Sequence, residues 1–178
     1  MGYWSTRGLR GSTFESMINM STDVYEDKKL AIIQKIPTPI TPVSIDKSKN
    51  AITLGYFDKK STVDYIGVVQ GVPVAFDAKE TNRKNLPLQN IHEHQMEFME
   101  KFEAQQGIAF FLVSFTLYDE IYFLPFQALK VYWDKAVKAN GRKSIPHTDF
   151  EEISIKVGKG KGVVVHYLEA LRKYLEAR

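Results

Sequence analysis

Residues 61–79 read STVDYIGVVQGVPVAFDAK, and this stretch decides the fold. β-Branched and other apolar residues run on both sides of Gln70-Gly71, a pair that suits the two-residue turn of a β-hairpin. If these two residues form the turn, residue 69 pairs with residue 72, and continuing outward places Asp64 directly opposite Asp77. The sequence therefore predicts a hairpin in which two carboxylates face each other across neighbouring strands.

The same pairing places Thr62 opposite Lys79. All four polar side chains then project from one face, because side chains alternate along a strand. Opposed Cβ atoms are about 4.5–5.5 Å apart, so Asp64 and Asp77 would repel each other unless they shared a cation. An isolated Asp-x-Lys sequence is more often a plain ion pair at a strand end. The acid opposite it favours a divalent metal with Lys79 at its edge.

This arrangement suits hydrolysis of a phosphodiester. Mg²⁺ prefers oxygen ligands and retains several waters, so it needs only one or two carboxylates from the protein. The ion can lower the pKa of a bound water and neutralise developing charge, and a nearby lysine adds positive charge where negative charge develops. We therefore expect an Mg²⁺-dependent nuclease, in which Mn²⁺ can substitute.

A helix predicted over residues 91–104 points to the same place. Its apolar stripe includes Gln95, which is either a hydrogen-bonded polar residue of the core or a side chain that reaches the polar end of the hairpin. The pattern leaves both interpretations open. His92 and His94 are two positions apart, so they should not face each other on a helix. We interpret them as half-exposed surface or DNA-facing side chains.

The rest of the chain predicts an α/β fold, with a mixed central β-sheet flanked by helices in one domain spanning residues 1–178. A capping-box pattern at residues 12–15 predicts that a helix begins there, and Glu15 either caps this helix or assists the metal. Further strands are expected at 29–35, 108–115 and 121–124, and further helices at 126–138 and 164–177.

Composition restricts the class of protein. The absence of cysteine excludes disulfides and thiolate metal sites. The sequence has no uninterrupted apolar stretch of membrane-spanning length and no signal-peptide core. We therefore expect a soluble, cytoplasmic protein that has no membrane partner.

The net charge of +3 is modest, so contacts with DNA must come from local basic clusters. Three segments supply them: a flexible N-terminal arm at 1–11, an insertion at about 38–61, and a glycine-rich segment at 156–162. Each alone suits a solvated basic loop, but beside a nuclease-like site they favour a surface that follows phosphates. The DNA-binding candidates are Arg7, Arg10, Lys47, Lys49, Lys59, Lys60, Lys159 and Lys161.

Asp64 followed by Asp77-Ala78-Lys79 resembles the signature of the PD-(D/E)xK nucleases. More specifically, the chain resembles the RecU Holliday junction resolvases over nearly its whole length. Members of that family carry glutamate where this chain has Asp77, and the short segment before residue 6 is compatible with a phage-encoded member. The resemblance lies in TRG at 6–8, KIPTP at 35–39, STVDY at 61–65, FDAKET at 76–81, LPLQN at 86–90, HEHQ at 92–95 and NGRKSI at 140–145.

The resemblance implies a restriction-endonuclease-like nuclease core, from which residues 38–61 project as a stalk that enters the centre of a four-way DNA junction. It implies a homodimer, with recombinases or branch-migration proteins as further partners. It also implies metal ligation by Thr62, Asp64, Asp77 and Gln95, with Lys79 as stabiliser of the transition state.

Three functional classes follow. The first is a Holliday junction resolvase, a structure-selective endonuclease whose two-fold symmetric dimer makes paired cuts during recombination and repair. The second is a restriction-like or mismatch endonuclease on the same core, which the insertion at 38–61 disfavours because it suits a branched substrate. The third is a junction-binding architectural protein without activity, which the set of polar residues on the hairpin disfavours.

Overall fold

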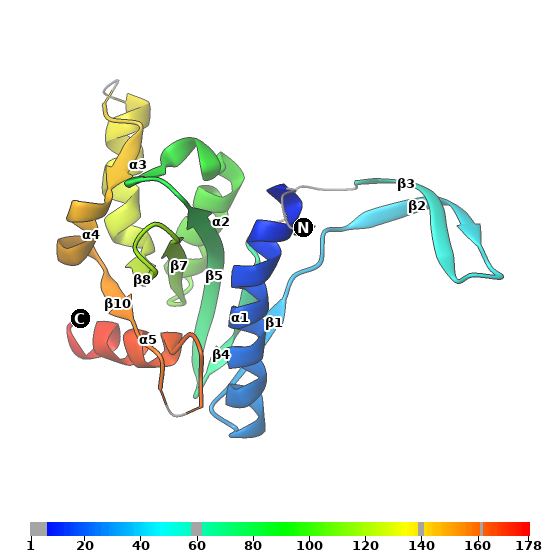
Figure 1. Cartoon of the computed structure of the whole chain (residues 1–178), viewed down its shortest axis with the longest axis horizontal. Helices are drawn as coiled ribbons and strands as arrows, with labels where there is room; N and C mark the ends of the chain where they lie inside the picture. The colour runs from blue at the N-terminus through cyan, green and yellow to red at the C-terminus, as the bar shows by residue number, and fades with distance from the viewer. Residues whose placement is uncertain (1–6, 58–61, 139–140, 161) are drawn as a thin grey trace, which may run out of the picture.

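A mixed β-sheet forms the centre of the computed structural model, which describes residues 7–57, 62–138, 141–160 and 162–178. The six strands lie in the order β1-β4-β5-β7-β8-β10 (Figure 1). β5 and β7 are parallel and the other neighbours antiparallel, so the sheet is mixed as predicted. The strands are β1 (Ala31–Lys35), β4 (Tyr65–Val69), β5 (Val72–Thr81), β7 (Ile108–Phe115), β8 (Glu120–Pro125) and β10 (Ile155–Val157).

The hairpin of β4 and β5 has the predicted register, from Val69 opposite Val72 to Tyr65 opposite Phe76. Gln70 and Gly71 both have positive φ, at 49° and 88°, as a two-residue turn of type I′ requires. The ladder ends at Tyr65, so Thr62 and Asp64 precede the strand rather than continuing it. Asp64 Oδ2 accepts the Ala78 N–H at 2.9 Å, which is the donor that the next hydrogen-bonded pair of the ladder would use.

Helices cover both faces of the sheet. α1 (Arg7–Asp27) and α5 (Tyr167–Glu176) pack on one face. α2 (Glu93–Ala104), α3 (Phe126–Lys138) and α4 (His147–Ile153) pack on the other. Strands buried on both sides explain the long apolar runs of β5 and β7. No helix in the described part of the chain has both the length and the apolar character needed to cross a bilayer.

The predicted insertion projects from this core as a separate two-stranded sheet (Figure 1). It consists of β2 (Ile40–Asp46) and β3 (Ala51–Phe57), and all residues of β3 are exposed. The chain leaves β1 at Lys35 to enter it and returns to β4 at Tyr65. The hairpin is therefore attached at the β1 edge of the main sheet.

Two predicted boundaries at the N-terminus were wrong. α1 begins at Arg7, so residues 7–11, expected in a flexible arm, are helical, and residues 12–15 lie inside the helix instead of capping it. Phe14, Ile18 and Tyr25 form the buried face of this helix. Burial of this face stabilises the whole helix, which local capping signals could not indicate.

The last helix also begins later than predicted, at Tyr167 instead of residue 164. The preceding residues are held in a loop: the Val163 N–H donates to the Gly160 carbonyl at 2.9 Å, and the Val165 N–H donates to Ser21 Oγ at 3.0 Å. Two short strands, β6 (Asn85–Pro87) and β9 (Ser144–Pro146), were not predicted. They pair with each other, and the 3₁₀ turn η1 (Leu88–Asn90) follows β6.

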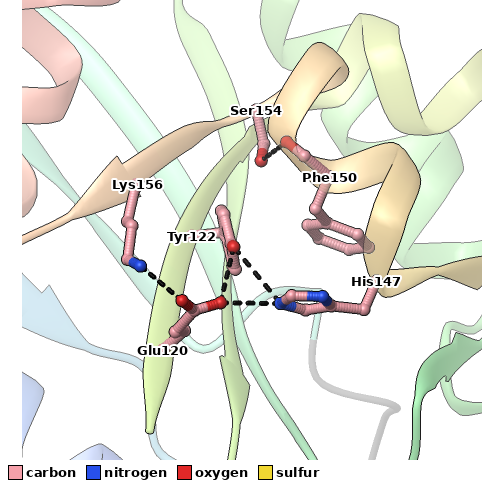
Figure 2. Close-up of polar contacts among 6 residues, drawn as sticks. All are labelled: Glu120, Tyr122, His147, Phe150, Ser154 and Lys156. Atoms are coloured by element: carbon pink, nitrogen blue, oxygen red, sulfur yellow. Dashed lines mark hydrogen bonds and ion pairs between the residues drawn. The ribbon is translucent and has the colours of Figure 1, made fainter. Parts of the chain in front are cut away.

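Glu120, the first residue of β8, joins three elements of the structure (Figure 2). Its Oε2 lies 2.7 Å from both the Tyr122 hydroxyl and His147 Nε2, and its Oε1 accepts a hydrogen bond from Lys156. His147 begins α4 and Lys156 lies on β10, so one carboxylate connects both elements to β8. The contacts lower the pKa of the Glu120 carboxyl to about 2, mainly through Lys156 and then through Tyr122.

This depressed pKa predicts a specific acid sensitivity. The folded-state pKa of about 2 lies below the ordinary 4.5, so the stabilisation is present above about pH 4.5 and is lost as the pH falls towards 2. Because the Glu120 side chain is 21% exposed, we expect an effect of about 1 kcal/mol. Urea unfolding near pH 7 and pH 3 should show that the wild type loses more stability than Glu120→Gln does.

Glu97→Gln is the matched control, since this carboxylate is 59% exposed in its pair with Lys101. It should follow the pH dependence of the wild type. If Glu120→Gln also followed the wild type, the stabilising role of Glu120 would be wrong.

Candidate functional site

Asp77 is the centre of the candidate site. It lies on β5 and its side chain is fully buried, on the face of the sheet that α2 covers. The pKa of its carboxyl is raised to about 7, chiefly by burial; the Lys79 ammonium opposes this increase, and the negative charge of Asp64 adds to it. A buried carboxylate beside a second carboxylate is costly unless positive charge is present, so Asp77 has the properties of a cation ligand.

Two side chains hold the Asp77 carboxylate in place. Lys79 Nζ donates to Oδ1 at 2.6 Å, and Gln95 Nε2 donates to Oδ2. Lys79 is on the same strand two residues later, whereas Gln95 comes from the first turn of α2. The Gln95 side chain fits both interpretations, because it is a buried, hydrogen-bonded polar residue and it also reaches the polar end of the hairpin.

Asp64 and Thr62 approach from the segment before β4. Asp64 is half-buried, and its Oδ2 is fixed by the Ala78 N–H. Asp64 raises the pKa of Asp77 through its negative charge and through a side-chain hydrogen bond. The two carboxylates therefore lie close together, as the hairpin register predicted. Thr62 is also half-buried, and among the described residues it makes no hydrogen bond to either carboxylate.

Glu15 lies at the periphery of this site. Its carboxylate forms an ion pair with Lys35, the last residue of β1. The pKa of the buried Tyr65 hydroxyl is raised chiefly by burial and further by Glu15, Asp64 and Asp77, so all three acids lie within electrostatic range of one group. Glu15 does not cap α1, which begins eight residues earlier. Lys35 ends the strand predicted at 29–35 and begins the KIPTP motif, but no pattern in the sequence indicates that it pairs with Glu15.

The arrangement of the histidines differs from the prediction. His92 is the N-cap of α2 and not part of the helix, so its ring stacks on that of His94, with centroids 5.3 Å apart and planes 11° apart. The His92 N–H donates to Gln95 Oε1 at 3.1 Å. The N-cap therefore orients the Gln95 amide so that its nitrogen faces Asp77.

The donor set fits a hard divalent cation. Asp64 and Asp77 supply carboxylate oxygens, and the raised pKa of Asp77, caused chiefly by burial, shows that its negative charge is costly even beside Lys79. No group of three or more His, Cys, Asp or Glu side chains suited to hold a metal occurs among the residues with described positions. Two carboxylates plus neutral oxygens are sufficient for Mg²⁺, which retains water, but are unsuited to a tight Zn²⁺ site.

The DNA-binding candidates are dispersed. Lys47 and Lys49 lie exposed at the tip of the projecting hairpin, where Lys49 is 3.9 Å from Asp46, and Lys159 is exposed in the loop after β10. Arg7 and Arg10 lie in the first turns of α1. Lys59, Lys60 and Lys161 lie outside the described residues.

The chain is similar to known proteins of one family. The family model for Recombination protein U, RecU, matches residues 9–173. The Holliday junction resolvase RecU of Oenococcus oeni is 42% identical over 170 residues, covering 93% of this chain and 86% of that protein. The Holliday junction resolvase RecU of Lactococcus lactis subsp. cremoris (strain MG1363) is 43% identical over 176 residues, covering 96% and 81%.

The Holliday junction resolvase RecU of Bacillus subtilis is 36% identical over 168 residues, which cover 92% of this chain and 80% of that protein. Among solved structures, the Holliday junction resolvase Hjc of Archaeoglobus fulgidus aligns with a TM-score of 0.46 at 10% identity, covering 78% of this chain and 94% of that chain.

Proposed function

Because this chain belongs to the RecU family, we propose that it is a Holliday junction resolvase, a structure-selective endonuclease that cuts four-way DNA junctions. The observation that carries the proposal is the buried Asp77 carboxylate, held by Lys79 and Gln95 beside Asp64. An acid pair in this state is suited to bind a cation and is unsuited to a purely structural role.

We further propose Mg²⁺ as the cofactor, with Mn²⁺ able to substitute, held by Asp64 and Asp77 with Thr62 and Gln95 as additional oxygen donors. When bound, the ion supplies a Lewis acid for phosphodiester hydrolysis. Gln95 serves as such a donor only if its amide turns, because its oxygen now accepts the His92 N–H. Glu15, which is paired with Lys35 on β1, remains a candidate to assist the metal from α1.

Lys79 has a separate role in this proposal. Its ammonium is mostly buried and is held by Asp77, so its position is defined before substrate binds. A fixed positive charge in a partly buried site stabilises the negative charge that develops on the phosphate without reorganisation of solvent. The residue therefore acts on the transition state rather than on the binding of DNA.

A homodimer completes the proposal. Paired cuts in a junction with two-fold symmetry require two sites related by the same symmetry, which an isologous dimer supplies. The substrate implies that the protein acts in the cytoplasm, where recombinases and branch-migration proteins are potential partners.

The test is cleavage of a labelled four-way junction, compared with linear and mismatched duplexes, with Mg²⁺ and with chelator. A resolvase cuts the junction in symmetric pairs only with metal. Equal cleavage of linear or mismatched duplex would indicate the restriction-like alternative, whereas tight binding without cleavage under all conditions would indicate an architectural protein.

The projecting hairpin should determine the preference for junctions. Replacing Lys47, Lys49, Lys59 and Lys60 with alanine should lower the junction-to-duplex affinity ratio by about tenfold or more, because four phosphate contacts near the hairpin would be lost. The fold should persist, since the strand pairs of the main sheet lie outside this segment. Gel-shift titrations of both substrates and a thermal melt measure these effects.

A matched control, the remote-surface variant, replaces four other exposed basic residues with alanine: Lys28, Lys101, Lys173 and Arg178. These residues lie after α1, in the last turn of α2, on α5 and at the C-terminus. The control should leave the affinity ratio unchanged. An equal loss of affinity for junction and duplex in the hairpin variant would mean that its lysines are only non-specific contacts.

A further inference from the structure

Two basic pairs, Arg83-Lys84 and Arg142-Lys143, are far apart in the sequence, and the pairing of β6 with β9 places them at the two ends of one short ladder. The ladder joins Asn85 with Pro146 and Pro87 with Ser144. It continues at both ends, where the His147 N–H donates to the Lys84 carbonyl at 3.0 Å and the Leu88 N–H donates to the Lys143 carbonyl at 3.0 Å. We call these four residues the basic ladder.

The basic ladder is exposed and carries unneutralised charge. All four residues are exposed, and none of them forms an ion pair with another residue in the part of the chain that the structure describes. Lys156 differs from these four residues, because Glu120 neutralises its charge in an ion pair (Figure 2). Concentrated positive charge without acidic partners is the electrostatic property of a polyanion-binding surface.

The first pair is connected rigidly to the candidate site. β5 carries Asp77 and Lys79 and ends at Thr81, whose hydroxyl organises the next turn. Thr81 Oγ1 accepts the Arg83 N–H at 3.2 Å and donates to the Asn85 carbonyl at 3.1 Å. Arg83 and Lys84 therefore have a defined position relative to the catalytic strand.

The second pair is held as firmly. Asn85 Nδ2 donates to Ser144 Oγ at 3.2 Å, which adds a side-chain bond to the ladder. On the other side, the Gly141 N–H donates to the Lys135 carbonyl at 3.1 Å, and a Cβ at Gly141 would come within 2.7 Å of that oxygen. The segment therefore packs closely against α3 just before Arg142. Both attachments fix Arg142 and Lys143 in place.

The location of the basic ladder differs from that of the projecting hairpin. The hairpin is attached at the β1 edge of the main sheet, whereas β9 joins α3 to α4, which pack against β7, β8 and β10 beyond β5. Figure 1 shows the hairpin on one side of the core and α3 and α4 on the other. The strand that carries Asp77 and Lys79 lies between them.

We propose that the basic ladder binds the phosphates of a duplex DNA arm on the side of the catalytic site that lies away from the projecting hairpin of β2 and β3. This inference rests on the proposed function, because it assigns a second contact to the same substrate. Leu88 is the ladder partner of Lys143. Lys84 and Leu88 are four residues apart, which corresponds to about 13 Å in extended chain at ~3.3 Å per residue. That span is comparable with the major groove, about 12 Å wide, so the two pairs can contact both backbones of one arm.

The test compares two variants that remove the same number of positive charges. The ladder variant carries Arg83→Ala, Lys84→Ala, Arg142→Ala and Lys143→Ala, and the remote-surface variant is the control. Affinities for a four-way junction and for linear duplex are measured over a range of salt concentrations in chelator, so that no cleavage occurs. Each lost phosphate contact lowers the slope of log K against log[salt] by about 0.9.

We expect the slope for the ladder variant to fall by about 2–4 for both substrates, with at least a tenfold loss of affinity at moderate salt. At saturating protein with Mg²⁺, single-turnover cleavage should stay within a few-fold of the wild-type rate, because the catalytic residues are unchanged. A second variant, Arg83→Lys with Arg142→Lys, keeps the charge and should keep the slope. Thermal melts of all variants confirm that they fold.

The outcomes separate this inference from the proposed function. A ladder variant whose salt slope equals that of the remote-surface variant overturns the inference, even if the wild type cuts junctions normally. A wild type that binds but never cuts four-way junctions refutes the proposed function, and the salt slopes still decide whether the basic ladder binds DNA.

Discussion

Asp77→Asn is expected to abolish cleavage of a four-way junction while binding of the junction survives. The substitution removes the buried carboxylate of the Asp64–Asp77 pair, and it leaves the basic surface unchanged. The loss should exceed the ~10²–10³-fold effect of one electrostatic contact, because the metal itself is lost. The measurement is single-turnover cleavage in Mg²⁺ beside a gel-shift titration in chelator.

Asp77→Glu is the control for this prediction. It keeps the charge, and the resemblance to the family implies glutamate at this position, so cleavage should persist. Because Asp77 is fully buried, an added methylene should lower the free energy of unfolding by about 1–3 kcal/mol. If Asp77→Asn cut junctions at the normal rate, Asp77 would not belong to the catalytic site.

Lys79→Met is expected to retain metal and junction but to lose turnover. The ammonium donates to Asp77 Oδ1 at 2.6 Å, so two roles are open to it. If it only neutralises Asp64 and Asp77, its removal leaves two uncompensated acids, and metal should bind at least as well while cleavage continues. If it stabilises the transition state, the rate should fall ~10²–10³-fold, about 2.7–4 kcal/mol.

Calorimetric titration of metal beside single-turnover cleavage distinguishes the two roles of Lys79. Lys101→Met is the matched control, because Lys101 is 79% exposed and forms a long, solvent-exposed ion pair with Glu97, at 3.9 Å. It should leave both metal affinity and rate unchanged. Near-normal cleavage by Lys79→Met would remove the catalytic assignment and, with it, the main argument for a nuclease site on this hairpin.

The local features of the site could be predicted from the sequence. The Gln70-Gly71 turn and the alternation of side chains determine the register of the hairpin, and the register brings Asp64 and Asp77 together. These are short-range properties, since turn chemistry and a period of two act over a few residues. The strand at 108–115 and the helix at 126–138 were predicted with their observed bounds for a similar reason, because each has a clear apolar pattern.

The limits of local signals appear at α1 and at the histidines. The pattern at residues 12–15 suits a helix start, but burial of Phe14 and Ile18 stabilises a helix that begins at Arg7. The prediction that His92 and His94 do not face each other assumed that both were helical. His92 is the N-cap, where the backbone is extended, and the two rings stack.

What the sequence by itself determined is therefore the hairpin that carries Asp64 and Asp77, the α/β class and, through its likeness to RecU, the family. Only the tertiary structure decided three things: that Gln95 reaches Asp77, that Glu15 pairs with Lys35, and that β9 places a second basic pair at the other end of the ladder from Arg83-Lys84. Each joins residues from different elements. Such contacts depend on how helices and strands pack in three dimensions, and neither periodicity nor turn chemistry carries that information.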